Sequence, residues 1–279
     1  MKRLTINSEG DVHLLATRLD FHVFRGQKQD WPVQSRLARV LQSLGCESEN
    51  WKNRENNIIR EFASRIHLYE HSPIDQADKL GCCSLMQHYG APTRLIDFTA
   101  SFYVALFFAV EDVEYTGDSV VWCLNEMKIR DKAIPRESVS APDGNERQYQ
   151  YDEMRKQATG VLASDSQPEG GLLLIEPAQK NQRLSRQQGC FLFPKQIDQD
   201  LSGILASDFS CDASENDCSV SDFTGANHDK VALKVIIPSK LRRDLLPGML
   251  WRMNINHEVL FPGIDGFCKS MTHYCGHAG

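Results

Sequence analysis

Apolar residues recur along the chain with two different spacings, and the spacing changes near Gly117. Before this point, apolar positions three and four residues apart predict amphipathic helices. Ser101 precedes the longest apolar run and is placed to cap its helix. The predicted helices cover residues 11–19, 33–44, 54–69, 75–89 and 102–111, and one early strand covers 21–26.

After Gly117 the apolar runs become short and β-branched, and turn residues bound them, which is typical of strands. Residues 131–170 are polar, with one candidate helix near 151–157. Helices gathered in the first half and strands in the second predict an α+β fold in one domain, residues 1–279. The later strands are expected at residues 118–125, 171–177, 190–193 and 231–238.

One segment departs from this pattern in both composition and charge. Residues 196–229 contain eight Asp or Glu and no Lys or Arg, so the rest of the chain carries about +2 of the formal net charge of −6. We interpret residues of about 198–229 as an acidic loop insertion that the fold does not need. The slightly basic remainder allows a local basic groove.

The composition of the chain limits the classes of protein to which it can belong. Hydrophobic content of 41% and charged content of 24% are ordinary for a globular chain with a real core. The longest apolar run is too short for a membrane span, and the N-terminal residues do not resemble a signal peptide. Nine cysteines at irregular spacing are therefore expected to be reduced thiols, and a cytoplasmic location is expected.

Two polar islands lie beside apolar elements and are candidates for a site. In "FRGQ", Arg25 offers a planar fork of donors that suits phosphate, and Gly26 permits a close approach of the backbone. A surface arginine before a turn would give the same pattern. In "QHYGAPTRLIDFT", His88, Arg94 and Asp97 surround a tight turn, either as ligand contacts or as a structural ion pair and a helix-end contact.

Later motifs are less specific. "RLSRQQGCF" leads into a strand, and "NHEVLFPG" places Glu258 before an apolar triplet. The chain has neither a GxGxxG loop nor a Walker loop. A zinc site could be imagined near the C-terminus, but CxxC pairs are absent and no metal is expected. Its ligands would be Cys268, His273, Cys275 and His277.

Taken in order, these motifs resemble the FRG domain family, which is named for the motif seen here as Phe24-Arg25-Gly26. The resemblance rests on "FRGQ", "LMQHYGAPTRLIDFTASFYVALFFAV", "NQRLSRQQGCF" and "VLFPGIDGF", and it spans most of residues 21–270. FRG domains are in turn related to ADP-ribosyltransferases. This relation implies a split, mixed β-sheet core with a helical N-terminal half and an NAD-binding cleft.

The segment "NINHEVLFPG" is similar to the E-x-E-V-L-x-P segment of arginine–serine–glutamate ADP-ribosyltransferases, so the resemblance makes Glu258 the catalytic glutamate. Asn256 then falls where those enzymes carry the Glu or Gln that orients the target. "RQQG" stands in chain order where they carry a Ser-Thr-Ser motif. The residues implied to bind NAD are Arg25, Gly26, His88, Thr93, Arg94, Asp97 and Gln187.

The function implied is that of an NAD-dependent mono-ADP-ribosyltransferase, a glycosyltransferase acting in a toxin–antitoxin system or in antiviral defence against phage. NAD is the co-substrate, and the acceptor is a macromolecule. RNA is favoured over protein because Asn256 has a shorter reach than Glu. An antitoxin is a further possible partner. Two alternatives stay open: an NAD glycohydrolase, and a non-catalytic module that binds NAD or nucleic acid.

Overall fold

The computed structural model describes most of the chain and leaves out short stretches. Described are residues 1–69, 75, 77–112, 114–141, 144–166, 168–177, 181–211, 216–221, 223 and 230–276, with backbone alone at 216, 243–244, 246–247 and 273–276. The strands are β1 (Lys2–Thr5), β2 (His22–Gln27), β3 (Ile96–Thr99), β4 (Ser119–Asn125), β5 (Leu172–Ile175), β6 (Gly189–Pro194), β7 (Asn216–Ser219) and β8 (Ala232–Ile237).

Helices occur along the whole chain, both before and after the central strands. They are α1 (Glu9–Arg18), α2 (Arg36–Ser43), α3 (Trp51–Arg65), α4 (Lys79–His88), α5 (Phe102–Val110), α6 (Glu126–Ala133), α7 (Glu146–Ala163), α8 (Gln182–Arg186), α9 (Leu201–Phe209), α10 (Ser239–Asp244), α11 (His257–Leu260) and α12 (Ile264–Gly276). Short 3-10 turns lie at Ser48–Asn50, Ile66–Leu68 and Arg136–Ser138, and a π-helical segment lies at Leu245–Leu250.

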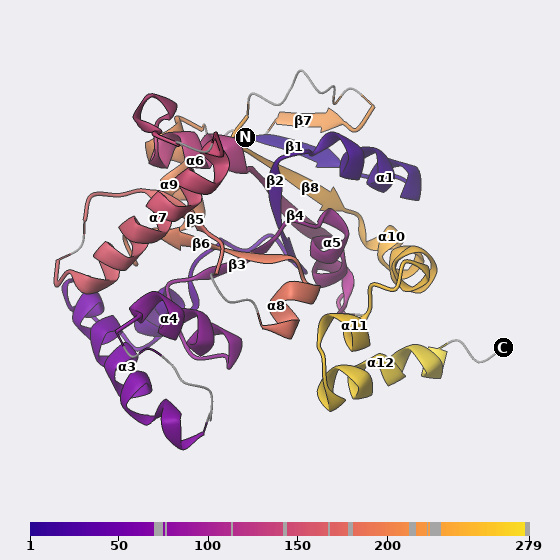
Figure 1. Cartoon of the computed structure of the whole chain (residues 1–279). Helices are drawn as coiled ribbons and strands as arrows, with labels where there is room; N and C mark the ends of the chain where they lie inside the picture. Colours follow the sequence, from indigo (N-terminus) through magenta and orange to yellow (C-terminus); the bar gives the residue numbers. More distant parts are fainter. Residues whose placement is uncertain are drawn as a thin grey trace.

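The described strands form one mixed sheet of eight in the order β5-β6-β3-β2-β4-β8-β1-β7 (Figure 1). β1 runs parallel to both β7 and β8, and the other neighbours are antiparallel. The order does not close on itself, so the sheet is open. It keeps β2 in the interior, with β3 on one side and β4 on the other.

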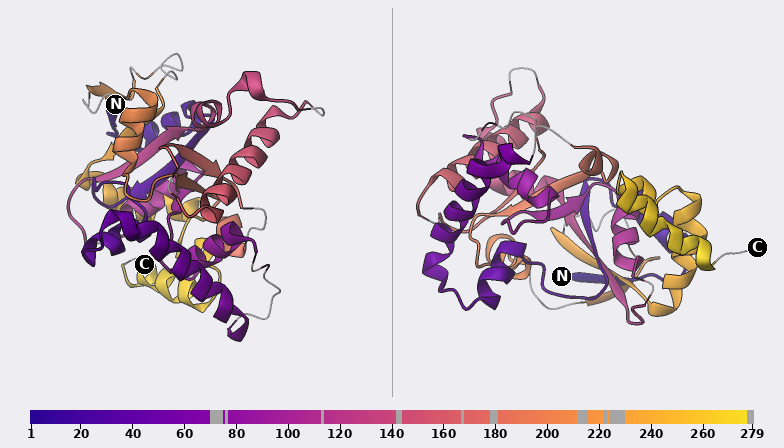
Figure 2. Two further views of the ribbon diagram at one scale, coloured as in Figure 1. Left: turned by 90° about the vertical axis from the view of Figure 1, so that its left-hand side faces the viewer. Right: turned by 90° about the horizontal axis from the view of Figure 1, so that it is seen from below.

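Alternating side chains of β4 fill the two faces of the sheet, as a strand buried on both sides requires. Val120, Trp122 and Leu124 join a core with residues of α3, α4, α6, α7 and α9. Val121 and Cys123 join a second core with residues of α1, α5, α11 and the π-helical segment. The result is a layer of helices on each face of the sheet (Figure 2).

Several predicted elements are confirmed. The strand at "FHVFRG" and the four later strands are present as β2, β4, β5, β6 and β8. The early helices are present as α1 to α5, and Ser101 caps α5 by accepting a hydrogen bond from the backbone N–H of Val104. The candidate helix near 151–157 is the middle of the longer α7.

Three sequence predictions need correction. The half-and-half division is wrong, because β1 to β4 begin before residue 120 and α7 to α12 follow it. The turn motif contains β3, which had been missed. The segment 198–229 is not simply a loop: it contains α9, which buries Leu201, Ile204 and Leu205, and the edge strand β7. Its described part therefore contributes to both cores.

None of the described helices combines the length and the apolar character that crossing a bilayer requires. No disulfide joins the cysteines whose side chains are described. Cys123 and Cys83 are buried, and burial raises the pKa of both thiols, so they stay protonated and act as small apolar side chains.

Candidate functional site

A cavity of about 670 Å³ lies where four of the sequence motifs meet. Its wall takes residues from β2, β3, α4 and β6, from the C-terminal end of α5, and from α8, α11 and α12. The size lies within the range of cavities that hold nucleotides and drug-sized ligands. The predicted site residues that it brings together are Arg25, Gly26, His88, Asp97 and Gln187.

Strand pairing explains why distant motifs converge here. β2 pairs with β3 through Phe24 and Thr99, and β3 pairs with β6 along its full length. The Thr99 hydroxyl donates a 2.6 Å hydrogen bond to the carbonyl oxygen of Gln187, just after α8. The side chain of Gln187 donates to the carbonyl oxygen of Leu260 at 3.0 Å. The sheet, α8 and α11 are thereby tied into one wall.

Arg25 lies in β2, is half-buried, and uses only part of its hydrogen-bonding capacity within the protein. Its Nη1 donates to the backbone oxygen of Asp97 at 2.8 Å. Its Nε is buried and has no hydrogen-bond partner among the described residues. Burial lowers the pKa of Arg25, the charge of Asp97 opposes this shift, and Arg39 adds to it. An arginine with unmet donors in a cavity wall is suited to bind an anion.

Gly26 is explained by packing rather than by a ligand. A Cβ at this position would lie 2.7 Å from the backbone nitrogen of Ala109 and closer still to the carbonyl oxygen of Ala105. Both atoms belong to α5, so glycine lets this apolar helix lie directly on β2. The close contact also places the end of α5 at the cavity.

A chain of side-chain hydrogen bonds fixes the wall at α4 and β3. Gln87 donates from Nε2 to Oδ2 of Asp97 at 2.8 Å. Thr93 donates from Oγ1 to Oε1 of Gln87 at 2.6 Å. Thr93 is buried and does not line the cavity, whereas Gln87 and Asp97 do. Thr93 therefore positions the wall rather than forming it.

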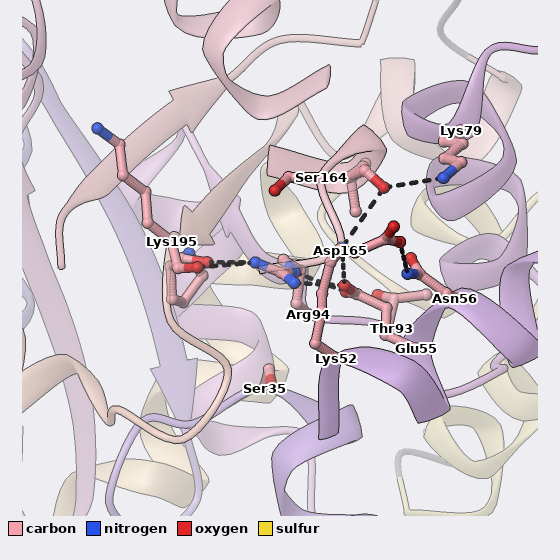
Figure 3. Close-up of polar contacts among 12 residues, drawn as sticks. Ser35, Lys52, Glu55, Asn56, Lys79, Thr93, Arg94, Ser164, Asp165 and Lys195 are labelled. Atoms are coloured by element: carbon pink, nitrogen blue, oxygen red, sulfur yellow. Dashed lines mark hydrogen bonds and ion pairs between the residues drawn. The ribbon is translucent and has the colours of Figure 1, made fainter. Parts of the chain in front are cut away.

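Arg94 also lies outside the cavity, in a buried polar cluster (Figure 3). Its Nε donates to Oε1 of Glu55 at 2.6 Å, and Nη2 donates to the other carboxylate oxygen. Nη1 donates to the backbone oxygen of Lys195 at 2.9 Å. The exposed fractions of the side chains are 0% for Arg94 and 3% for Glu55. This bidentate, saturated geometry makes Arg94 a structural residue that joins α3 to β3 and β6.

His88 lies at the end of α4 on the cavity wall, half-buried. Burial lowers the pKa of its imidazole, and the nearby charge of Arg183 lowers it further. A neutral imidazole at neutral pH keeps both a donor and an acceptor for a ligand.

The "NHEVLFPG" motif forms the short helix α11. Asn256 is its N-cap and accepts a hydrogen bond from the N–H of Val259 at 3.1 Å. Glu258 is exposed and does not line the cavity, whereas its neighbour His257 does. Nε2 of His257 lies 2.8 Å from Oε2 of Glu111, another cavity residue. The glutamate that the resemblance nominates is thus not among the carboxylates of the wall, which are Asp97, Glu111 and Asp112.

Sequence reasoning missed three residues that the geometry singles out. Gln27 lines the cavity and is 7% exposed, and its buried Oε1 has no hydrogen-bond partner in the part of the chain that the structure describes. Gln87 orders Asp97, and Glu111 holds His257. The first two stand inside the motifs "FRGQ" and "QHYGAPTR", so the motifs were the available signal. Glu111 follows the apolar helix and gives no such signal.

The kinds of side chain that bind metal ions in proteins include Cys, His, Asp and Glu. Among the residues that the structure describes, no three or more His, Cys, Asp or Glu side chains are grouped so that they could hold a metal ion. Three of the four C-terminal residues considered as ligands, His273, Cys275 and His277, have side chains outside the described set.

Comparison with known proteins gives one match, to part of the chain. No curated protein and no solved structure matches the chain. A family model does match residues 21–117, which include β2, the α4–β3 turn and α5, and thus the Arg25, Gln87 and Asp97 side of the cavity. The family that this part of the chain matches is the FRG domain.

Proposed function

We propose that this chain is an NAD-dependent mono-ADP-ribosyltransferase that binds NAD in the 670 Å³ cavity and transfers ADP-ribose to a macromolecule. The observation that carries the proposal is the composition of the cavity wall. Arg25 of the FRG motif lines it together with Gln27 and Asp97. Gln27 has a buried Oε1 without a partner among the described residues, and Asp97 supplies a carboxylate. NAD offers diphosphate oxygens for the arginine and a carboxamide that can donate to Oε1 of Gln27.

The reaction breaks the bond between nicotinamide and its ribose, and positive charge develops on that sugar. A fixed carboxylate lowers the energy of this transition state. We assign this role to Glu258 by the FRG and ADP-ribosyltransferase resemblance, with Glu111 as the matched comparison because it faces the cavity. Asn256 would help to orient the acceptor, with RNA favoured over protein. The biological setting proposed is a toxin–antitoxin system or defence against phage.

The first test measures nicotinamide release from NAD by wild-type protein and by Glu258→Gln and Glu111→Gln. Loss of one transition-state contact of this kind lowers the rate by about 100-fold or more. We expect this loss in Glu258→Gln with NAD binding still measurable. If Glu111→Gln loses the activity and Glu258→Gln keeps it, the catalytic role moves to Glu111. Absence of any release by wild-type protein contradicts the proposal.

The acceptor is identified in the same preparation. Labelled NAD is incubated with cell lysate, and the product is divided between nuclease and protease digestion. Label released by ribonuclease supports an RNA acceptor, and label released by protease moves the acceptor to protein. Nicotinamide release without macromolecular labelling identifies an NAD glycohydrolase instead.

One observation favours a second candidate function. Glu258 lies outside the wall that holds Arg25, which is the arrangement expected of a module that binds NAD or nucleic acid without catalysis. NAD binding by calorimetry together with no nicotinamide release in any acceptor mixture would support this function.

A further inference from the structure

A smaller cavity of about 220 Å³ adjoins the main one and shares part of its wall, including Arg25, Gln87 and Asp97. It extends the shared wall toward the N-terminus of α2 and the turn after α4. Arg36 and Gly90 line this extension and do not line the main cavity.

The charge of this smaller cavity is strongly one-sided. Arg25, Arg36, Arg39 and Arg183 line it, from three different elements, and Asp97 is the single carboxylate in the wall. Oδ2 of Asp97 already accepts a hydrogen bond from Gln87. One carboxylate cannot neutralise four guanidinium groups, so the wall keeps a positive field.

The hydrogen bonds of these arginines leave most donors unused. Arg36 donates from Nη1 to the carbonyl oxygen of Gly90. Arg183 lies with its guanidinium carbon 4.7 Å from the ring centre of Phe261. Within the described part of the chain, no carboxylate forms an ion pair with Arg36, Arg39 or Arg183. The buried Nε of Arg25 also lacks a hydrogen-bond partner in that part of the chain.

Two of these arginines lie where their charge is unfavourable for the helix that carries them. Arg36 is the first residue of α2 and Arg39 lies within its first turn, and that turn holds no acidic residue. The N-terminus of a helix carries partial positive charge, so cations there are unfavourable and an anion is favourable. These two arginines therefore lower the stability of the protein without ligand, and a bound anion would restore it.

The pKa shifts of two wall residues follow from the same crowding of arginines. The charge of Arg39 lowers the pKa of Arg25 in addition to burial, and the charge of Arg183 lowers the pKa of His88. Each arginine is thus close enough to affect a neighbouring group on the wall.

We propose that the smaller cavity is a phosphate-binding subsite, in which Arg36, Arg39 and Arg183 hold phosphoryl oxygens next to Arg25. Guanidinium groups bind phosphate through paired N–H donors, and several of them around one small cavity favour a dianionic or diphosphate group. The site does not depend on NAD cleavage. Its phosphate could come from a dinucleotide in the main cavity or from the backbone of an RNA acceptor.

The test uses calorimetry with inorganic pyrophosphate on the full chain and on Arg39→Gln, Arg36→Gln and Arg54→Gln. Arg39 is exposed and has no protein acceptor among the described residues, so its variant is expected to fold normally. Arg54 is an exposed arginine on α3 outside both cavities and serves as the matched control. Loss of one charged hydrogen-bond donor weakens binding by about tenfold or more.

We expect this weakening in both cavity variants and none in Arg54→Gln. No pyrophosphate binding by wild-type protein, or equal binding by all four proteins, overturns the proposal. Parallel titrations with ADP-ribose and with a short RNA separate the two sources. Weakened ADP-ribose binding identifies the dinucleotide, and weakened RNA binding with a shallower salt dependence identifies the nucleic acid. Nicotinamide release, measured separately, reports on the proposed enzyme activity alone.

Discussion

Two arginines from neighbouring motifs have opposite surroundings in this molecule. Arg94 has a carboxylate on two of its nitrogens and a backbone oxygen on the third, and its side chain is fully buried. Among the described residues, Arg25 has one backbone acceptor and a buried Nε without a partner, and it lines a cavity. A saturated arginine holds a fold together, whereas an unsaturated one in a cavity wall has binding capacity left.

The largest loss of stability is expected from replacing Arg94. In Arg94→Met, the carboxylate of Glu55 stays buried with Lys52 as its remaining partner, 3.2 Å away. Breaking a buried pair from one side typically costs about 3–5 kcal/mol. We expect a loss of that order in the free energy of unfolding, measured by urea titration. Arg54→Gln, on the exposed face of α3, should change it by less than about 0.5 kcal/mol.

A loss below about 1 kcal/mol in Arg94→Met would contradict the structural role. Arg94 would then have to be reconsidered as a residue whose function lies outside stability. Calorimetry with NAD on the same variant, at a temperature where it is folded, would measure that function directly.

The next largest effect is expected at Gly26, the neighbour of Arg25 on β2, which packs against α5. Gly26→Ala pushes a methyl group into the backbone of α5, at Ala105 and Ala109. Overpacking of this kind costs about 1–3 kcal/mol. Thermal unfolding should show a lower midpoint.

Gly160→Ala is the matched control for Gly26, because a Cβ at this position in α7 meets open space. Alanine is favoured over glycine within a helix by about 0.5–1 kcal/mol, so this variant should be slightly more stable. Equal behaviour of the two variants would show that α5 moves away from β2 without cost.

The sequence predicted the elements around Arg25 better than it predicted the role of Arg94. It identified β2, α5 and the Ser101 cap because a polar cap followed by an apolar run is a local signal. The sequence nominated Arg94 for binding because its partner Glu55 lies far away in the chain, on α3, and a buried carboxylate looks like any surface glutamate in the sequence. Saturation of a donor is a property of three-dimensional neighbours.

The acidic segment shows a different reason for error. Its charge indicated a solvated loop, and the apolar spacing of Leu201, Ile204 and Leu205 was overlooked. These residues are three and four apart, which is the helical spacing, and all three are buried. Deletion of the whole segment is therefore expected to unfold the protein, in contrast to the expectation from composition.

A smaller effect is expected on the binding side of the comparison. Arg25→Lys keeps the charge and loses the planar fork. NAD affinity should fall by about tenfold, in line with the loss of one charged hydrogen bond, while the unfolding midpoint changes little. Calorimetry and a melting curve on the same preparation measure both. Unchanged affinity, or a melting change as large as that of Arg94→Met, would place Arg25 with the structural arginines.

The smallest effect concerns pH and His88. Burial and the charge of Arg183 lower the pKa of His88 from its ordinary value of 6.5 in the folded protein. The unfolded chain therefore takes up this proton at a higher pH than the folded chain, and stability falls as pH drops through 6.5 toward the folded pKa. His88→Gln should remove part of this decline in urea titrations compared at about pH 8 and about pH 5.5.

Added pyrophosphate gives a second test of His88. An anion beside Arg183 offsets the positive charge that disfavours a protonated imidazole. The bound anion should raise the pKa of His88 toward its ordinary value and make the decline of wild-type stability with falling pH shallower. In His88→Gln, the same addition should stabilise the protein without this change in pH dependence. An identical pH response of the two proteins, with and without pyrophosphate, would mean that His88 and Arg183 do not share a site with the anion.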